Sequence, residues 1–415
     1  MNKLLNKISI NIPLQVSLVI IPLSLLIMGD SILYILLPAN SDFFEINSFL
    51  NLSDEFWIGF LLSINRIVRF FTNVISGQVF RKLGFRNTVF LACLLGAAST
   101  LFYAILKGIV LLILARVIWG FSYSLFRLTY QLRVFSYESN NFGKYLGYCV
   151  GVQRTGSFLV VTIGVLASIK FGINITLICL SLLIIPAIFV AYFIKDLDVS
   201  KLSPKKTNWN LTYNEQVNTI RKKIIIISIF KFSSSFSSNG LALATIIPFL
   251  MSLQKNEYDL ETIIALGGFI IGFKYIADIF FGIIFGSISD RYGRNINIII
   301  SSFLMIFAIV ISISGYNFYV TVVCIVLLFF FSVSLETSLD ALLGQLSPEK
   351  DKSSIISRYS TWQDSGAALG PIIGYMIASA YTVQLGYILS VILLSLCLYS
   401  FYRFFIKKNN FIEST

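Results

Sequence analysis

The stretch Gly286-Ser-Ile-Ser-Asp290-Arg291-Tyr-Gly293-Arg294 stands between two strongly apolar segments of the chain. Gly286 allows a neighbouring helix to approach closely, and Gly293 allows a left-handed turn. Asp290 and the two arginines form a charge cluster that can lock or release packed helices. The stretch therefore predicts two packed helices joined by a tight, charged connection.

A weaker copy of this pattern lies about 210 residues earlier, as Gly77-Gln-Val-Phe-Arg81-Lys82-Leu-Gly84-Phe-Arg86. The spacing of the two glycines is retained, whereas Arg81 occupies the position of the aspartate. Two copies of one pattern, each between apolar segments, indicate that the chain is built from two related halves.

The composition places the chain in a membrane. Of its 415 residues, 56% are hydrophobic and only 13% are charged. A soluble protein of this length could not bury so much apolar surface, so lipid is the expected solvent for most of it. Twelve segments are long enough to cross a bilayer of roughly 30 Å at 1.5 Å per residue. They are expected near residues 15–38, 55–79, 88–106, 109–131, 146–169, 173–194, 224–252, 262–287, 297–315, 318–345, 356–380 and 384–406.

The predicted fold is an all-α integral membrane protein with twelve transmembrane helices in two pseudo-symmetric six-helix bundles. The one long polar connection carries Pro204 and two lysine clusters, and it reads as a linker between the bundles. The expected organisation is an N-terminal bundle over 1–194, a cytoplasmic linker over 195–223, a C-terminal bundle over 224–406 and a cytoplasmic tail over 407–415.

Basic residues are distributed unevenly between the two sides of the membrane. Of the 32 lysines and arginines, 22 lie in the tails and in the connections on the side of the linker, and 7 lie within spans. The opposite side holds only Lys107, Lys170 and Lys255. Because positive charge stays in the cytoplasm, both termini are expected there. The net charge of +12 then faces anionic lipid headgroups and not nucleic acid.

Several functional classes find no support in the residue types. The chain has no histidine, which removes the usual zinc ligands, histidine-dependent triads and histidine proton relays. Its five cysteines lie in apolar segments without metal or disulfide spacing. We therefore expect no enzyme, no metal site and no cofactor. The richness in Ile, Asn and Lys hints at a bacterial source, which would place the protein in the cytoplasmic (inner) membrane.

The loop pattern resembles that of the major facilitator superfamily, and two further motifs support the resemblance. Leu114-Ala-Arg116-Val-Ile-Trp-Gly120 resembles the family motif with an arginine inside the membrane, which is linked to proton coupling. Gly366-Ala-Ala-Leu-Gly370-Pro371-Ile-Ile-Gly374 resembles the Gly-Pro antiporter motif, which the family usually carries in segment five and not in segment eleven. The resemblance covers nearly the whole chain. It implies alternating access, in which two halves rock about a central polar cavity.

A narrower resemblance concerns the cargo. Asn65-Arg66-Ile-Val-Arg69 in segment two and the run from Tyr359 to Pro371 resemble bacterial drug- and siderophore-type exporters of the superfamily.

Charged residues inside the membrane are expensive and therefore candidates for function. Asp30 and Arg116 are expected at similar depths in segments one and four. Beside an arginine, Asp30 can exchange its proton when substrate or an outward opening separates the pair. The alternative is a permanent structural ion pair.

Three arginines give the N-terminal half a basic centre: Arg66, Arg69 and Arg154. By the repeat, Arg69 corresponds to Asp278 and Arg154 to Asp364, so the two halves carry opposite charges at these positions. In one interpretation the arginines bind an anionic cargo, because guanidinium holds carboxylate or phosphate through two hydrogen bonds. In the other, they pair with Asp278 and Asp364 across the interface and form a gate.

The C-terminal half carries its own intramembrane charges. Lys274 and Asp278 are four residues apart on a helix and can neutralise each other. Lys231 stands beside the polar run 233–239, which is expected to line the cavity or to pack helices through serine. Glu336 and Asp340 are expected in the charge network of the loop motif.

The candidate residues fall into three groups. Those assigned to substrate binding are Arg66, Arg69, Arg154, Lys231, Asn239 and Lys274. Those assigned to proton coupling are Asp30 and Arg116. Those assigned to gating are Gly77, Asp278, Gly286, Asp290, Arg291, Arg294, Glu336, Asp340 and Asp364.

The first functional hypothesis is proton-coupled export of a small anionic or polycarboxylate molecule, such as a siderophore or an organic acid. The second is a multidrug efflux antiporter, and the third is import of a metabolite or a metal chelate. A channel or a non-transporting receptor would need no rocking halves. The expected partners are a small-molecule substrate, protons and membrane lipid, with the protein acting as a monomer.

Overall fold

The computed structural model describes residues 12–46, 52–137, 142–196, 215–253, 259–315, 317–347 and 352–407. The elements of the first half are α2 (Leu14–Ser31), α3 (Leu33–Ala39), α4 (Asp54–Ile105), α5 (Ile109–Phe135), α6 (Phe142–Leu159), a π-helical turn η3 (Val160–Gly164), α7 (Val165–Phe171), α8 (Ile173–Leu183) and α9 (Ile185–Tyr192). Those of the second half are α10 (Glu215–Ser235), η5 (Phe236–Ala242), α11 (Leu243–Leu253), α12 (Leu260–Ile276), η6 (Ala277–Phe281), α13 (Gly282–Tyr292), α14 (Arg294–Ser314), α15 (Phe318–Leu346), α16 (Lys352–Ala380), α17 (Val383–Tyr402) and η8 (Arg403–Lys407).

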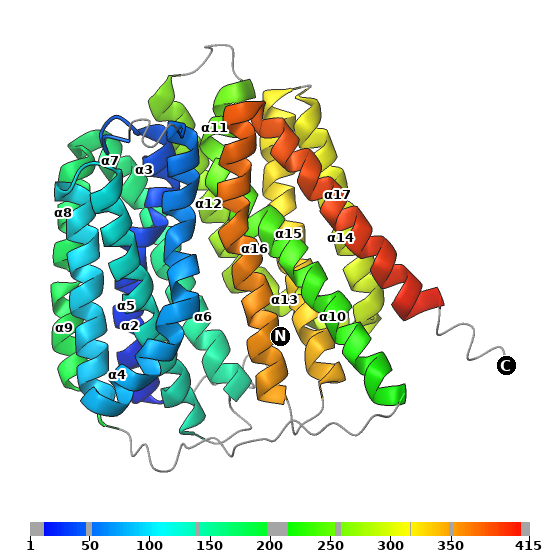
Figure 1. Ribbon diagram of the computed structural model, residues 1–415, viewed down its shortest axis with the longest axis horizontal. Helices are drawn as coiled ribbons and strands as arrows, with labels where there is room; N and C mark the ends of the chain where they lie inside the picture. Colours follow the sequence, from blue (N-terminus) through cyan, green and yellow to red (C-terminus); the bar gives the residue numbers. More distant parts are fainter. Residues whose placement is uncertain are drawn as a thin grey trace, which may run out of the picture.

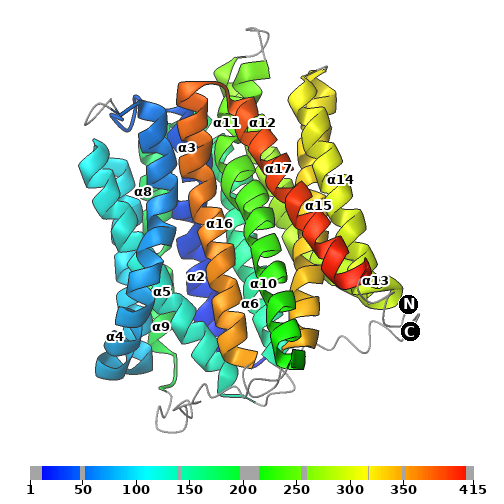
Figure 2. The same cartoon turned by 45° about the vertical axis from the view of Figure 1, so that its right-hand side comes forward.

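These elements form the two predicted bundles. Figure 1 shows α2 to α9 on one side of the molecule and α10 to α17 on the other, and Figure 2 shows the same arrangement after a turn of 45°. Helix α4 contains both the second and the third predicted span. Gly84, with φ 76° and ψ 179°, breaks the helical geometry between them. Gly293, which corresponds to Gly84 in the repeat, likewise has a positive φ of 99° between α13 and α14. Both copies of the loop motif thus use a glycine to redirect the chain.

Within the described residues, ten helices are long and apolar enough to cross a membrane. The two further predicted spans are the part of α4 before Gly84 and the whole of α16. These two helices are less apolar because they carry Arg66, Arg69 and Asp364. The predicted fold of twelve transmembrane helices in two six-helix bundles is confirmed.

One boundary differs from the prediction. Helix α10 begins at Glu215, inside the stretch 195–223 that was expected to be linker. Residues 215–223 are polar and charged, but glutamate, glutamine, lysine and arginine are good helix formers. The apolar pattern marks where lipid contact begins, and the helix starts before it.

The two halves are sealed against each other on the side away from the linker. Buried aliphatic residues of both halves, including Leu33, Val161 and Ile264, belong to one continuous apolar core. A Cβ added at Gly268 on α12 would lie 3.5 Å from Val165 and 3.6 Å from Ile35 of the first half. A Cβ at Gly59 on α4 would lie 2.7 Å from the Pro371 carbonyl oxygen on α16.

The Gly-Pro motif of α16 serves close helix packing, and this role can be tested by substitution. A Cβ at Gly370 would lie 2.5 Å from the Cα of Gly240 in η5, so Gly370→Ala must push two backbones apart. Overpacking of this kind costs about 1–3 kcal/mol, and we expect a lower thermal midpoint in detergent. Gly344→Ala is the matched control, because nothing lies within 4 Å of the added carbon. Equal midpoints for both variants would contradict the packing role.

Candidate functional site

A cavity of about 440 Å³ lies between the two halves. It is lined by residues of the part of α4 before Gly84, of the middle of α6 and of the C-terminal ends of α10 and α12. Tyr130 of α5 and Asp340 of α15 line it from the linker-side parts of their helices. The apolar seal closes the opposite side, so the cavity extends from the centre of the molecule towards the linker. Eleven charged residues line it: Asp30, Arg66, Arg69, Arg127, Arg154, Lys231, Lys274, Asp278, Glu336, Asp340 and Asp364.

Asp30 and Arg116 form the expected ion pair inside the first half. Arg116 is only 2% exposed and also donates to the Leu61 carbonyl at 2.7 Å and to the Leu62 carbonyl at 3.2 Å. Asn65 donates to the same carboxylate oxygen of Asp30 at 2.9 Å. Asp30 therefore connects a fully buried cation to the cavity wall.

An ion-pair cluster joins the halves between α6 and α12/η6. The Arg154 guanidinium lies 3.2 Å from Asp278, and the Lys274 ammonium lies 2.8 Å from the same carboxylate oxygen. The predicted neutralisation of Lys274 by Asp278 is confirmed, as is a pairing of Arg154 with an aspartate across the interface. The cluster retains one positive charge because two cations share one carboxylate.

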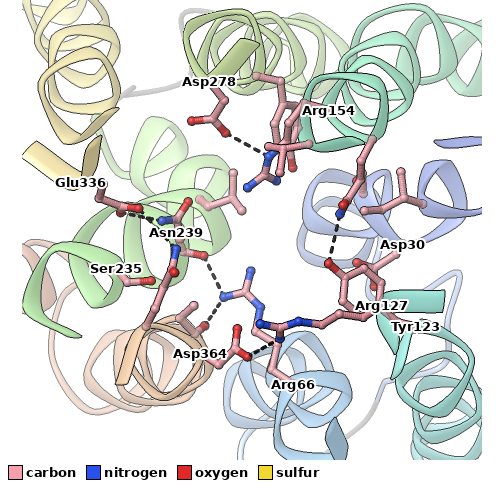
Figure 3. A pocket seen from close by; sticks show the side chains of 18 of the residues that line it. Asp30, Arg66, Tyr123, Arg127, Arg154, Ser235, Asn239, Asp278, Glu336 and Asp364 are labelled. Carbon is pink, nitrogen blue, oxygen red and sulfur yellow. Dashed lines mark hydrogen bonds and ion pairs between the residues drawn. The ribbon is translucent and has the colours of Figure 1, made fainter. Parts of the chain in front are cut away.

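A second pair crosses the interface between α5 and α16. Arg127 Nη1 lies 3.0 Å from Asp364 Oδ2 (Figure 3). Arg127 was not predicted from the sequence as a partner of Asp364. The predicted pairing of Asp364 with the arginines of α4 or α6 is also not what forms, although the charge of Arg69 acts on Asp364 from nearby. A helix position fixes how deep a residue lies, but helix rotation and crossing decide which opposite charge it meets.

Among the described residues, Arg66 and Arg69 form no ion pair. Arg66 donates to the carbonyl oxygens of Asn239 and Ala367 in the second half, at 3.1 Å and 2.5 Å. Arg69 lies over the ring of Tyr123 with its guanidinium carbon 4.8 Å from the ring centroid, and its buried Nε has no hydrogen-bond partner. Both arginines line the cavity. Their charges are therefore available to an anionic ligand.

Among the described residues, Glu336 and Asp340 form no ion pair with the arginines of the loop motif, which contradicts the prediction. They lie four residues apart on α15, and both bind Lys231 of α10, at 3.1 Å and 2.9 Å. Asn239 donates to Glu336 at 2.8 Å, and the Tyr359 hydroxyl donates to Asp340 at 2.6 Å. The i, i+4 spacing places both carboxylates on the same helix face, towards Lys231. Because this lysine is only 1% exposed, it needs a counter-charge.

The loop motif itself docks on α15. Arg294 donates to the Ala341 carbonyl and to the Gln345 side chain, both at 3.0 Å. A Cβ at Gly286 would lie 3.7 Å from Thr337, which fits a close helix approach. Arg291 is exposed, and the predicted contacts of the Asp290 side chain lie outside the described part of the structure. In the first-half copy, Gly77 lies beside Arg81.

The cavity carries an excess of positive charge. With Arg116 behind Asp30, seven cations face five carboxylates among the described residues, which leaves two positive charges. The loop motif, Arg116 in α5 and the arrangement in two helical bundles are the features that resemble the major facilitator superfamily.

The comparisons with known proteins agree. The family model described as Major Facilitator Superfamily matches residues 264–411. By this match, residues 264–411 in the second half of the chain belong to the major facilitator superfamily. This match and the apolar helices indicate a multi-pass membrane transporter rather than an enzyme. No curated protein sequence matches the chain.

Three solved transporter structures share the fold over nearly the whole chain. The nucleoside transporter NupG has a TM-score of 0.71 at 15% identity, over 95% of this chain and 100% of its own. A D-xylose-proton symporter has a TM-score of 0.72 at 13% identity, over 94% and 97%. A bacterial homologue of the human lysosomal transporter Spinster, inward-facing and unoccupied, has a TM-score of 0.69 at 12% identity, over 95% and 98%. At such identities the likeness concerns the fold alone.

Some cavity residues were not among the candidates. Arg127 and Tyr123 lie eleven and seven residues after Arg116 on α5, spacings that place all three on one helix face. That periodicity could have identified them. Tyr359 carries no comparable signal, because its role depends on how α16 packs against α15.

Proposed function

We propose that this transporter moves a small organic anion with two or more negative charges across the cytoplasmic membrane by alternating access. A polycarboxylate such as a siderophore or an organic acid fits this description. The observation that carries the proposal is the pair Arg66 and Arg69, which line the cavity without a carboxylate partner and supply its excess of two positive charges.

The energetic argument follows from where these arginines lie. A cation in a partly dehydrated cavity is costly without a counter-charge. The ligand supplies that counter-charge when a carboxylate or phosphate accepts charge-assisted hydrogen bonds from the guanidinium groups. A multidrug site for apolar compounds would be lined mainly by apolar and aromatic groups, whereas eleven charged residues line this one.

Proton coupling and direction complete the proposal. Asp30 is the proton carrier, because it faces the cavity on one side and Arg116 on the other. With the linker in the cytoplasm, as the distribution of basic residues indicates, the cavity faces inward. We assign export because the arginine motif of α4 and the Gly-Pro run of α16 resemble exporters of the superfamily.

The test is an untargeted metabolite comparison, inside and outside cells with and without the protein, in iron-replete and iron-starved growth. We expect a polycarboxylate to accumulate inside the cells that lack the protein. Accumulation only under iron starvation would identify a siderophore. Loss of tolerance to assorted amphiphiles, with no change in any anionic metabolite, would overturn the proposal in favour of multidrug efflux.

A further inference from the structure

We infer that the transported anion also carries a protonated amine, which Glu336 and Asp340 bind, so that the substrate class is an amino-polycarboxylate. The inference rests on the proposed function and narrows it. It starts from the part of the cavity wall that Lys231, Glu336 and Asp340 form. Here carboxylates outnumber cations, whereas Arg66 and Arg69 have no carboxylate partner among the described residues.

The acidic side of the cavity has one more carboxylate than it has cations. Lys231 alone lies between Glu336 and Asp340. The lysine is 1% exposed, whereas the Asp340 side chain is 54% exposed. The cation is therefore behind the carboxylates, and the carboxylates carry one more negative charge than Lys231 neutralises.

A buried hydroxyl beside this cluster has no partner. Ser235 lies on α10 one turn after Lys231 and lines the cavity, and its buried Oγ forms no hydrogen bond with any described residue. The neighbouring serines are satisfied, since Ser234 and Ser238 both donate to Glu336, at 3.5 Å and 3.4 Å. A buried polar atom without a partner is rare in proteins, and a ligand ammonium would supply the missing donor.

The cationic and acidic parts of the wall are close enough for one molecule. Arg66 binds the backbone oxygen of Asn239, and the side chain of Asn239 binds Glu336 (Figure 3). One asparagine thus connects the two parts. A dicarboxylate without an amine would fill the arginine side but place methylene groups against the uncompensated carboxylate. An amine at that position forms charge-assisted hydrogen bonds instead.

The test compares isosteric pairs that differ only in NH₂⁺ and CH₂. Binding of iminodiacetate and glutarate, and of ethylenediamine-N,N′-diacetate and suberate, is measured by calorimetry on the purified full-length protein in metal-free buffer at neutral pH. We expect each amine to bind at least about tenfold more tightly than its isostere, since a hydrogen bond between charged groups accounts for that factor or more.

Variants locate the effect. Asp340→Asn, at the more exposed carboxylate, and Glu336→Gln are each expected to reduce the amine preference, which is the ratio of the two dissociation constants within a pair, below about threefold. Glu261→Gln, at an exposed glutamate on α12 outside the cavity, is the matched control and retains the preference. Equal affinities within each pair for the unmodified protein would overturn the amine inference and leave the proposed function standing. Failure of all four compounds to bind would overturn both.

Discussion

Asp30→Asn is expected to abolish uphill transport while leaving exchange of substrate across the membrane within about twofold of the parent protein. With one proton per substrate, a gradient of two pH units sustains a concentration ratio of about 100, and we expect the variant to lose all of it. The reason is that asparagine keeps the size and the hydrogen-bonding capacity of the side chain but cannot take up or release a proton.

We propose Asp30 for this role, rather than another carboxylate, because of the groups that it contacts. Asp30 forms an ion pair with the buried Arg116 and also lines the cavity. Asn65, which also binds Asp30, lies next to Arg66 on α4, so movement of the arginines on substrate binding reaches the pair directly.

The measurement uses proteoliposomes with a substrate identified by the metabolite comparison. Accumulation is followed with an imposed pH gradient, and counterflow exchange is followed without one. Removing one partner of a buried pair can cost about 3–5 kcal/mol, so the thermal midpoint of the variant is measured alongside. Asp42→Asn, at an exposed aspartate outside the cavity, is the control. Unchanged uphill accumulation in the Asp30 variant would remove Asp30 from the coupling mechanism.

Arg69→Gln is expected to raise the dissociation constant for the anionic substrate about 10- to 100-fold with little change in turnover at saturation. Each hydrogen bond between a guanidinium and a carboxylate contributes about 1.5–3 kcal/mol, and Arg69 has a free buried Nε and no carboxylate within ion-pair distance among the described residues. Arg66→Gln is expected to change both quantities, because Arg66 also bonds to two carbonyl groups of the other half.

This pair of variants separates the two interpretations of the basic centre. A cargo-binding arginine changes affinity, whereas a gate arginine changes the rate at which the halves rock. Binding is measured by calorimetry and turnover by exchange in proteoliposomes, with Arg221→Gln on the exposed start of α10 as the control. A normal dissociation constant in Arg69→Gln, with slowed exchange, would assign Arg69 to the gate and leave the site without its main anion-binding group.

The amino-acid sequence by itself determined the membrane-spanning architecture and the identity of the intramembrane charges. Each span is an almost continuous apolar run, and lipid forces such a run to satisfy its backbone groups as a helix. Asp30, Arg66, Arg154 and Lys231 stand out for the same reason, since a charge within an apolar run must face a cavity or another charge. The two copies of the loop motif and their offset revealed the two halves.

Only the tertiary structure decided which charges meet. Asp364 binds Arg127 and not Arg154, its counterpart in the repeat, and Lys231 takes both Glu336 and Asp340 away from the loop motif. These partners lie on different helices and are separated by about 100 to 240 residues in the chain. Their approach depends on helix rotation, on the π-helical turns η5 and η6 that reorient Asn239 and Asp278, and on the glycine contacts that set how closely α16 packs. The cost of burying a charge requires a partner, but the packing of the whole bundle selects it.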